Sequence, residues 1–359
     1  MGADVAVIGA GAWGTALAIE LVRCGHRVTL WHPNPDRAEA MQQRRQNADY
    51  LPGIPLPDGI TATADMEQAL SGCPRLVFAV PSHALRRAAT DAAPFIAPSA
   101  QVVCASKGLE AETSELMHEV LAEVLSERDT LVGILSGPSF AQEVAEGKPT
   151  AVTVAAERLE EAEVLADWFR CGPGSLRPQD EGAGRRLSGG SVRVYSSDDR
   201  VGIELGGAVK NVIAIAAGIA DGLDLGYNAR AALITRGLAE MARLGEAWGG
   251  RAETFAGLAG LGDLVLTCTG PLSRNYQLGE WLGAGTALAE VDPVLWRRAE
   301  GVRTARALHH KARALEVDMP IAEQVYRVLY GGEAPHEAVA ALLQRRPKPE
   351  DPPVSGGEA

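Results

Sequence analysis

The chain has 359 residues, of which 46% are hydrophobic and 22% are charged. This composition is that of a folded globular protein and excludes a predominantly disordered chain. The 34 basic and 46 acidic residues give a formal net charge of −12, whereas proteins that coat nucleic-acid phosphates usually carry an excess of positive charge. We therefore expect about two domains and no nucleic-acid partner.

No apolar run approaches the roughly 18 to 20 residues that span a bilayer, and the first residues show no basic region of an export signal. The sequence thus predicts no integral membrane segment and a cytoplasmic location. The cysteines are odd in number, scattered and without a CxxC pair, so reduced thiols and no metal site are expected. They are Cys24, Cys73, Cys104, Cys171 and Cys268.

The first half of the chain alternates short apolar runs with helical patterns such as residues 15–24. The apolar runs lie at residues 4–9, 27–31, 76–80, 101–105, 131–135 and 150–155. This alternation is typical of βαβ units and predicts an α/β fold class, with a Rossmann-like, mostly parallel sheet. Such sheets bind ligands beyond the carboxyl ends of their strands. We assign residues 1–198 to a dinucleotide-binding domain.

From about residue 202 the pattern changes to helical spacing alone. Helices are predicted at residues 204–220, 228–248, 297–316, 321–330 and 336–344. This change predicts an all-α C-terminal substrate domain at 199–345. Residues 171–193 are rich in Gly, Arg, Ser and Pro and are interpreted as an inserted loop, and residues 346–359 as a disordered tail.

The segment 9–14 reads Gly-Ala-Gly-Ala-Trp-Gly, which is the GxGxxG pattern. It follows a predicted strand and opens a predicted helix, the context of a dinucleotide-binding turn. Gly9 would form the tight turn, Gly11 would let the backbone approach a pyrophosphate, and Gly14 would allow close helix–strand packing. The alternative is an ordinary glycine-rich turn.

The end of the second predicted strand bears on the choice of cofactor. A site selective for NAD has Asp or Glu there to bind the ribose hydroxyl, but residues 30–37 read Leu-Trp-His-Pro-Asn-Pro-Asp-Arg. His32 and Arg37 are placed to meet a 2′-phosphate, which favours NADP. Asp36 could pair with Arg37, however, and NAD then remains open.

Two lysines stand out near predicted ligand sites. Lys107 follows a strand end, as does the polar segment 136–141. Lys210 lies in a very apolar helix, where a lysine is costly unless it faces a cleft. Its helical neighbours, among them Gly206 and Gly207, are small and would leave room for another molecule. Burial would lower the pKa of Lys210 and allow acid/base chemistry; the alternatives are a solvated loop lysine and a snorkelling structural lysine.

Polar groups recur downstream in apolar surroundings. Asp263 could pair with Lys210 and hold it in place, and Thr267 follows four residues later. The segment Ser273-Arg274-Asn275 combines a guanidinium, a hydroxyl and an amide at a predicted helix start, which suits a phosphate dianion. An ordinary surface arginine is the alternative for Arg274.

These motifs closely resemble the NAD(P)-dependent glycerol-3-phosphate dehydrogenases of bacterial type. The resemblance covers most of residues 4–345. The segments that carry it are GAGAWGT at the start, SKGLE at 106–110, SGPSFAQEV at 136–144, GGAVKNVIAIAAGIADGL at 206–223, NARAALITRGLAEMARLG at 228–245, AGLAGLGDLVLTCTGPLSRN at 256–275 and EGVRTARAL at 300–308.

The resemblance implies reversible reduction of dihydroxyacetone phosphate to sn-glycerol 3-phosphate by NADPH or NADH in a homodimer, with Lys210 as the catalytic acid/base. It implies a substrate site formed by Lys107, Gly137, Ser139, Asn211, Asp263, Thr267, Ser273, Arg274 and Asn275. It implies cofactor contacts from Ala12, Trp13, Ala141 and Glu300, shared with Lys107 and Arg274.

The sequence departs from the family pattern at Pro33, where an arginine is common, at Tyr227, at Tyr276-Gln277, and in a segment 171–193 that is roughly 15 residues longer than the family needs. Two other hypotheses remain. One is a dehydrogenase of the same build acting on a 3-hydroxy acid or on 6-phosphogluconate. The other is a module that senses NAD(P) without turnover.

Overall fold

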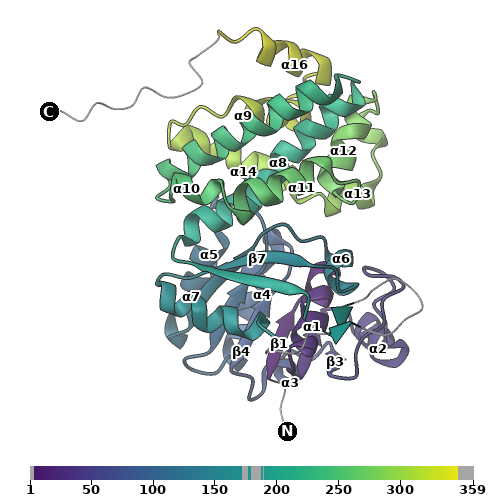
Figure 1. The fold of residues 1–359 in the computed structure, drawn as a ribbon, viewed down its shortest axis with the longest axis vertical. Helices are drawn as coiled ribbons and strands as arrows, with labels where there is room; N and C mark the ends of the chain where they lie inside the picture. The colour runs from purple at the N-terminus through teal and green to yellow at the C-terminus, as the bar shows by residue number, and fades with distance from the viewer. Residues whose placement is uncertain (1–3, 172–176, 179–186, 189, 347–359) are drawn as a thin grey trace, which may run out of the picture.

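The computed structural model describes residues 4–171, 177–178, 187–188 and 190–346. The described chain forms a sheet domain, from strand β1 to strand β10, and a helical domain, from helix α8 to helix α16. The helical domain lies on one end of the sheet domain, at the top of Figure 1. The fold class predicted from the sequence is confirmed.

The main sheet has eight strands in the order β10-β7-β6-β5-β4-β1-β2-β3. All neighbours are parallel except β6 and β7, which pair antiparallel. The strands are β1 (Val5–Ile8), β2 (Val28–Trp31), β3 (Ile60–Thr63), β4 (Arg75–Phe78), β5 (Gln101–Cys104), β6 (Leu131–Ser136), β7 (Thr150–Ala155) and β10 (Val192–Ser197).

All six apolar runs of the first half form strands. The strands β3 and β10 were not predicted: β3 is a four-residue edge strand, and β10 overlaps the end of the segment 171–193 that was interpreted as a loop. Within that segment β8 (Arg177–Pro178) pairs antiparallel with β9 (Leu187–Ser188). Residues 172–176, 179–186 and 189 of that segment, and residues 347–359 of the tail predicted at 346–359, lie outside the described residues.

Side chains alternate between the two faces of the sheet, as the pleat of a strand requires. Val5 and Val7 belong to one apolar cluster, and Ala6 and Ile8 to another. The sheet domain contains α1 (Ala12–Arg23), α2 (Pro35–Arg44), α3 (Met66–Leu70), α4 (Leu85–Ala92), α5 (Met117–Val124), α6 (Ala141–Ala145), α7 (Leu159–Ala166) and the 3₁₀ turns η1 (Ser82–Ala84), η2 (Ala93–Phe95), η3 (Ser126–Arg128) and η4 (Asp167–Phe169). Because both faces of the sheet are covered, the ends of its strands are left for ligands.

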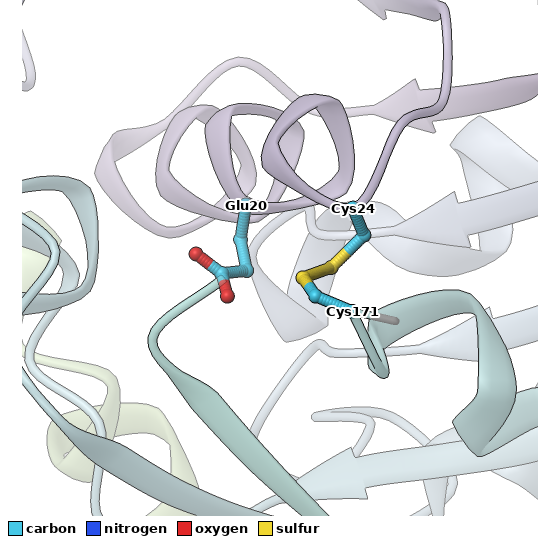
Figure 2. A group of neighbouring side chains, drawn as sticks. All are labelled: Glu20, Cys24 and Cys171. Carbon is cyan, nitrogen blue, oxygen red and sulfur yellow. A yellow bond between two sulfur atoms is a disulfide. The ribbon is translucent and has the colours of Figure 1, made fainter. Parts of the chain in front are cut away.

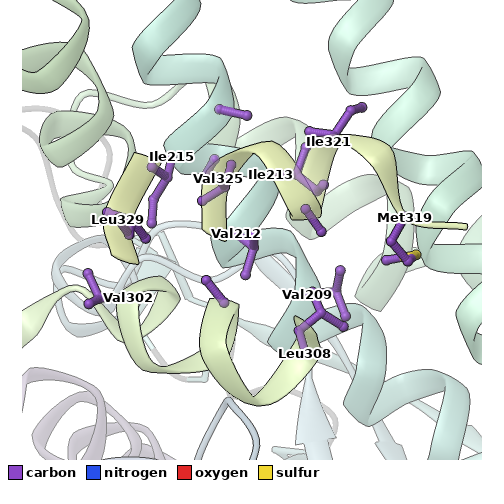
Figure 3. Close-up of a cluster of buried hydrophobic side chains, with 14 of the residues drawn as sticks. Val209, Val212, Ile213, Ile215, Val302, Leu308, Met319, Ile321, Val325 and Leu329 are labelled. Carbon is purple, nitrogen blue, oxygen red and sulfur yellow. The ribbon is translucent and has the colours of Figure 1, made fainter. Parts of the chain in front are cut away.

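Helix α8 (Arg200–Gly222) forms the centre of the helical domain, with every residue from Gly202 to Ala220 buried. In Figure 3 its side chains pack against α14 and α15. The other elements are α9 (Gly226–Ala247), α10 (Ala252–Phe255), the π turn η5 (Leu258–Gly262), α11 (Asp263–Thr269), α12 (Arg274–Gly283), η6 (Leu288–Glu290), α13 (Pro293–Arg298), α14 (Glu300–Ala314), α15 (Pro320–Tyr326), the π turn η7 (Arg327–Gly331) and α16 (Pro335–Leu343).

By length and hydropathy, α8 could cross a membrane, and the bent pair formed by residues 252–269 and 274–283 passes the same test if taken as one span. The apolar window of α8 is wholly buried inside the described part of the chain, as expected of a core helix.

The prediction of reduced thiols is wrong for two of the five cysteines. Cys24, at the end of α1, forms a disulfide with Cys171, 147 residues away (Figure 2). The spacing of the cysteines in the sequence could not reveal this pair, because only the folded chain brings the segment after η4 beside α1. The thiols of Cys73, Cys104 and Cys268 are free and buried.

Glu20 lies beside this disulfide (Figure 2). Its carboxylate accepts hydrogen bonds from the backbone N–H groups of Ser191 and Val192 and pairs with Arg23. These contacts already use its oxygens, and the two sulfurs are bonded to each other. The group therefore fastens the start of β10 to α1.

Candidate active site

The glycine-rich turn connects β1 to α1. Gly9 has a φ of +116°, and a Cβ there would lie 2.7 Å from the Ala79 oxygen, so only glycine fits. A Cβ on Gly14 would overlap the Gly9 carbonyl oxygen, whereas one on Gly11 would meet nothing within 4 Å. Gly9 and Gly14 are therefore required by the turn itself, and Gly11 faces open space. This is the arrangement expected where a backbone must be approached by a pyrophosphate.

Helix α1 begins at this turn with Ala12, and no side chain caps its N-terminus, which leaves N–H donors for an anion. The Nε1 of Trp13 is buried without a hydrogen-bond partner in the described structure. Gly11 faces open space, α1 presents its N-terminus, and Trp13 has a buried N–H donor without a partner in the described structure. Together these features are suited to bind a dinucleotide.

Asp263 joins two lysines from different domains. Its Oδ2 accepts a hydrogen bond from Lys107 Nζ at 2.8 Å, and its Oδ1 pairs with Lys210 Nζ. Lys107 follows β5, Lys210 lies in the middle of α8, and Asp263 begins α11. Lys107 also donates to the Gly137 carbonyl oxygen at 3.1 Å. The pairing of Asp263 with Lys210 predicted from the sequence is present.

The Lys210 side chain is buried, and its pKa is lowered to about 8. Burial is the main cause and repulsion by Lys107 adds to it, while Asp263 acts in the opposite direction. Lys210 also donates to Thr267 Oγ1 at 3.0 Å, and Thr267 donates to the Asp263 backbone oxygen at 2.6 Å. Two of the three ammonium N–H groups thus have partners among the described residues, and the third is left for a ligand.

The small residues beside Lys210 serve packing within the chain as well. A Cβ on Gly206 would overlap the Ala259 backbone in η5, and one on Gly207 would lie 2.5 Å from Ser136 Oγ. The space predicted for another molecule is thus used on this side by η5 and by β6. Ser136 Oγ is itself buried without a hydrogen-bond partner in the described structure.

Two amides link three elements beside Lys210. Asn275 Nδ2 donates to Asn211 Oδ1 at 2.9 Å, and Asn275 Oδ1 accepts from the Gly301 N–H at 2.9 Å. Asn211 Nδ2 donates to the Gly207 carbonyl oxygen at 3.3 Å. This chain of amides fixes α12 and the start of α14 against α8. The hydrogen bonds of Asn275 therefore hold helices together, and those of Asn211 belong to the same network.

Ser273 and Arg274 begin α12 but have different surroundings. The Ser273 hydroxyl accepts from the Tyr276 N–H at 3.2 Å and caps the helix. Arg274 is exposed as a whole residue, but the surrounding chain desolvates its guanidinium, which forms no hydrogen bond or ion pair with the described residues. Its pKa is lowered by desolvation, with a smaller opposing effect from Glu300. Arg274 is thus a free cation beside the site.

The loop after β6 completes the sheet side of the site. Gly137 has a φ of +139°, and Ser139 Oγ donates to its carbonyl oxygen at 2.9 Å. Ala141 is the first residue of α6. Glu300, the first residue of α14, accepts from Ser82 Oγ at 3.0 Å, and burial raises the pKa of its carboxyl.

The end of β2 differs in part from the sequence-based interpretation. His32 is buried, and desolvation lowers its pKa. Its Nδ1 faces the Asn34 N–H at 3.0 Å, so it stabilises the turn as a neutral ring and not as a cation. Arg37 is exposed and pairs with Asp49, with Nε and Oδ2 at 3.2 Å, and not with Asp36.

Sequence reasoning missed Tyr50 and Arg298. The Arg37 guanidinium and the Arg298 guanidinium both lie over the Tyr50 ring, 5.6 and 5.0 Å from its centroid. Tyr50 lies in a loop without a motif, and Arg298 is 248 positions further along the chain, so no local pattern indicates the contact.

Comparisons with known proteins identify the family of this chain. Family models for the N-terminus and the C-terminus of NAD-dependent glycerol-3-phosphate dehydrogenase match residues 4–162 and 199–340. The glycerol-3-phosphate dehydrogenase [NAD(P)+] of Thioalkalivibrio sulfidiphilus is 49% identical over 96% of this chain and 98% of its own length. That of a Geobacter species is 47% identical over 98% and 99%.

A crystal structure of glycerol-3-phosphate dehydrogenase from Coxiella burnetii shares the fold, with a TM-score of 0.86 and 40% sequence identity. The match covers 96% of this chain and 99% of that one. Two family models match this chain, and relatives are nearly half identical to it over almost the full length. Together these matches assign the family. The chain belongs to the family of NAD(P)-dependent glycerol-3-phosphate dehydrogenases.

Proposed function

We propose that this chain reduces dihydroxyacetone phosphate reversibly to sn-glycerol 3-phosphate, with Lys210 as the group that donates and accepts the proton. The observation that carries the proposal is the state of Lys210: a buried amine with a pKa of about 8 and one N–H group left for a substrate oxygen. An amine that titrates near neutral pH can give up and regain a proton within one cycle.

NADPH or NADH, when bound at the glycine-rich turn, supplies the hydride. The chain's own residues do the rest. Lys210 Nζ donates its third N–H to the ketone oxygen and passes a proton to it as negative charge develops there. In the reverse reaction the neutral amine takes the proton from the hydroxyl of glycerol 3-phosphate.

Asp263 holds both lysines in place for this step. Its two carboxylate oxygens each bind one ammonium group, so the positive charge of Lys107 lies close to that of Lys210. Lys107 lowers the pKa of Lys210 and adds positive charge near the developing alkoxide. Thr267 orients the Lys210 amine through its hydroxyl.

The substrate phosphate is assigned to Arg274, supported by the Ser273–Asn275 backbone at the start of α12. Arg274 is a guanidinium without a partner in the described chain, and α12 presents its N-terminus at the same place. Holding the remote phosphate orients the carbonyl toward Lys210. Gly137 and Ser139 lie on the opposite, sheet side of the site.

The remaining assignments are proposals of the same kind. The limits of the domains, 1–198 and 199–345, are supported by the end of β10 at Ser197 and the beginning of α8 at Arg200. The homodimer and the cytoplasmic location rest on the family resemblance. Tyr227, with 80% of its surface exposed at the start of α9, is an apolar group that a second copy could cover.

The test is oxidation of NADPH with dihydroxyacetone phosphate and, separately, with dihydroxyacetone. If the phosphate is held by Arg274, kcat/KM should be at least about 100-fold higher for the phosphorylated ketone, equivalent to about 2.7 kcal/mol. Equal rates would show that the phosphate is not recognised. Turnover with a 3-hydroxy acid or 6-phosphogluconate and NADP⁺ but not with glycerol 3-phosphate, or cofactor binding without any turnover, would favour the alternatives.

A further inference from the structure

Arg298 ends α13 of the helical domain, and its guanidinium lies 5.0 Å from the centroid of the Tyr50 ring in the sheet domain. Arg37, from α2, lies over the same ring at 5.6 Å and donates to Tyr50 Oη at 3.0 Å. Two guanidinium groups from different domains thus meet at one aromatic side chain.

The two arginines differ in their charge partners. Arg37 pairs with Asp49, whose carboxylate neutralises it. Arg298 is exposed and forms no hydrogen bond or ion pair with any described residue. The group of Arg37, Asp49, Tyr50 and Arg298 therefore carries one uncompensated positive charge. A guanidinium held against an aromatic ring with its N–H groups free is well prepared to bind a phosphate through two hydrogen bonds.

The loop that carries Tyr50 is attached to the glycine-rich turn. Asn47 Nδ2 donates to the Ala10 carbonyl oxygen and to Thr15 Oγ1, both at 2.8 Å, and is buried. Tyr50 also lies near His32, with 6.3 Å between the ring centroids, at the end of β2. In this fold the ribose of the adenosine half of a dinucleotide lies at the end of the second strand. Through Tyr50, the free charge of Arg298 is therefore placed at the ribose end, and it is also near enough to Arg274 to help lower the pKa of that guanidinium.

Other groups at the strand end do not supply this charge. Strand β2 does not end in a carboxylate, which is the group that binds the ribose 2′-hydroxyl in sites selective for NAD. His32 uses its Nδ1 in the turn and is buried, so it offers a neutral ring. The charge of Arg37 is already balanced by Asp49. Arg298 therefore accounts for the net positive charge of the group formed by Arg37, Asp49, Tyr50 and Arg298.

We propose that Arg298 binds the 2′-phosphate of NADPH from the helical domain and, together with Arg37, makes this chain prefer NADPH to NADH. The proposal rests on the proposed function only in taking the glycine-rich turn as the cofactor site. Since α13 leads directly into α14, a phosphate held between Arg298 and Arg37 would also tie the two domains together around the cofactor.

The test measures binding of two fragments, 2′,5′-ADP and 5′-AMP, to the full chain by calorimetry, with no turnover involved. Arg298→Ala should weaken 2′,5′-ADP about 10- to 100-fold and change 5′-AMP less than about threefold. The matched control is Arg297→Ala, which removes the neighbouring exposed guanidinium of the same helix and should change neither constant. Titration of NADPH and NADH fluorescence should show the same selective loss.

Equal weakening of both fragments would overturn the proposal and show that Arg298 supports the adenine through Tyr50. No change in either would exclude Arg298 from the cofactor site. Because these outcomes are read from binding, they are separate from the proposed function. If the fragments bind as expected and dihydroxyacetone phosphate is not reduced, the proposed reaction fails and the assignment of Arg298 stands.

Discussion

At the residue scale, the chemistry depends on one carboxylate between two ammonium groups. Asp263 is 1% exposed, and Lys210 is 6% exposed. Charges buried to this degree are tolerated only when each has a partner, because the cost of removing them from water is several kcal/mol per ion. The contact between Asp263 and Lys210 therefore both raises the pKa of the Lys210 amine and fixes its orientation.

Replacing Asp263 with Asn should shift the pH dependence of reduction. Asp263 raises the pKa of Lys210, so without its charge, burial and repulsion by Lys107 lower that pKa further below 8. Reduction needs the protonated amine, which is present below its pKa. The pH above which kcat for dihydroxyacetone phosphate declines should therefore fall, by about 1 to 3 units.

The measurement is a kcat–pH profile for Asp263→Asn, the wild type and Asp91→Asn. Asp91 is an exposed carboxylate on α4 and its variant should have the wild-type profile. Circular dichroism checks that Asp263→Asn is folded. A folded variant whose decline begins at the wild-type pH would contradict the role of Lys210 as the titrating acid.

Much of the site was predictable at this scale because charged residues in apolar segments are costly. That argument selected Lys210 and Asp263 and their pairing. It could not find Tyr50 or Arg298, because both are polar residues in exposed segments and their contact joins two domains. Ser273 was assigned to the substrate from its place in the Ser273-Arg274-Asn275 cluster and from the family resemblance; its hydroxyl caps α12 in the structure, and the substrate contact stays a prediction.

At the scale of elements, α1 has a different role at each end. Its N-terminus follows the glycine-rich turn, and its C-terminal half holds both sides of the segment 171–193. Cys24 binds Cys171 at the beginning of that segment, and Glu20 binds the N–H groups of Ser191 and Val192 near its end. The helix at the cofactor site is thus connected to the edge strand β10.

Replacing Cys24 with Ser should lower stability by up to about 5 kcal/mol in the chain-entropy account, because the disulfide closes a loop of 147 residues. Thermal melting should occur several degrees lower, and dithiothreitol should lower the melting temperature of the wild type but not of the variant. Cys73→Ser, which removes a free buried thiol, is the control for loss of a cysteine.

Thiol titration of the denatured wild type gives an independent check. Three free thiols before reduction and five after it are expected. Five free thiols without reductant would mean that Cys24 and Cys171 are not joined in the protein as isolated.

The predictability of elements followed their hydrophobic pattern. Runs of apolar residues formed buried strands, and 3.6-residue spacing predicted α8, α9, α14, α15 and α16 but not the short helices α10, α11 and α13. Strand β3 was missed because Ile60–Thr63 is short and lies at the sheet edge, where one face needs little apolar surface. Strand β10 was missed because it directly follows a segment rich in Gly and Arg.

At the scale of the whole molecule, the site exists only while the two domains are docked. Lys107 and Gly137 come from the sheet domain, and Lys210 and Asp263 from the helical domain. Glu204 on α8 accepts hydrogen bonds from the N–H groups of Met117 and His118 and contacts the His118 ring at 2.6 Å. This buried carboxylate joins α8 to the first turn of α5.

Replacing Glu204 with Ala should weaken that docking by about 2 to 4 kcal/mol, since it leaves buried donors without a partner. We expect a melting temperature several degrees lower and a loss in kcat, because Lys107 and Lys210 belong to different domains. Glu253→Ala, on the exposed surface of α10, is the control. Unchanged melting would show that Glu204 does not hold the domains together.

The central claim, that Lys210 is the proton donor of a dihydroxyacetone phosphate reductase, is tested most directly by Lys210→Ala. Turnover and NADPH affinity should be measured on the same preparation. The control is Lys311→Ala, which removes a lysine of α14 that lies over the Trp248 ring. The account predicts a loss in kcat of at least about 1,000-fold, with the Kd for NADPH changed less than about threefold. Turnover within tenfold of the wild type would contradict it.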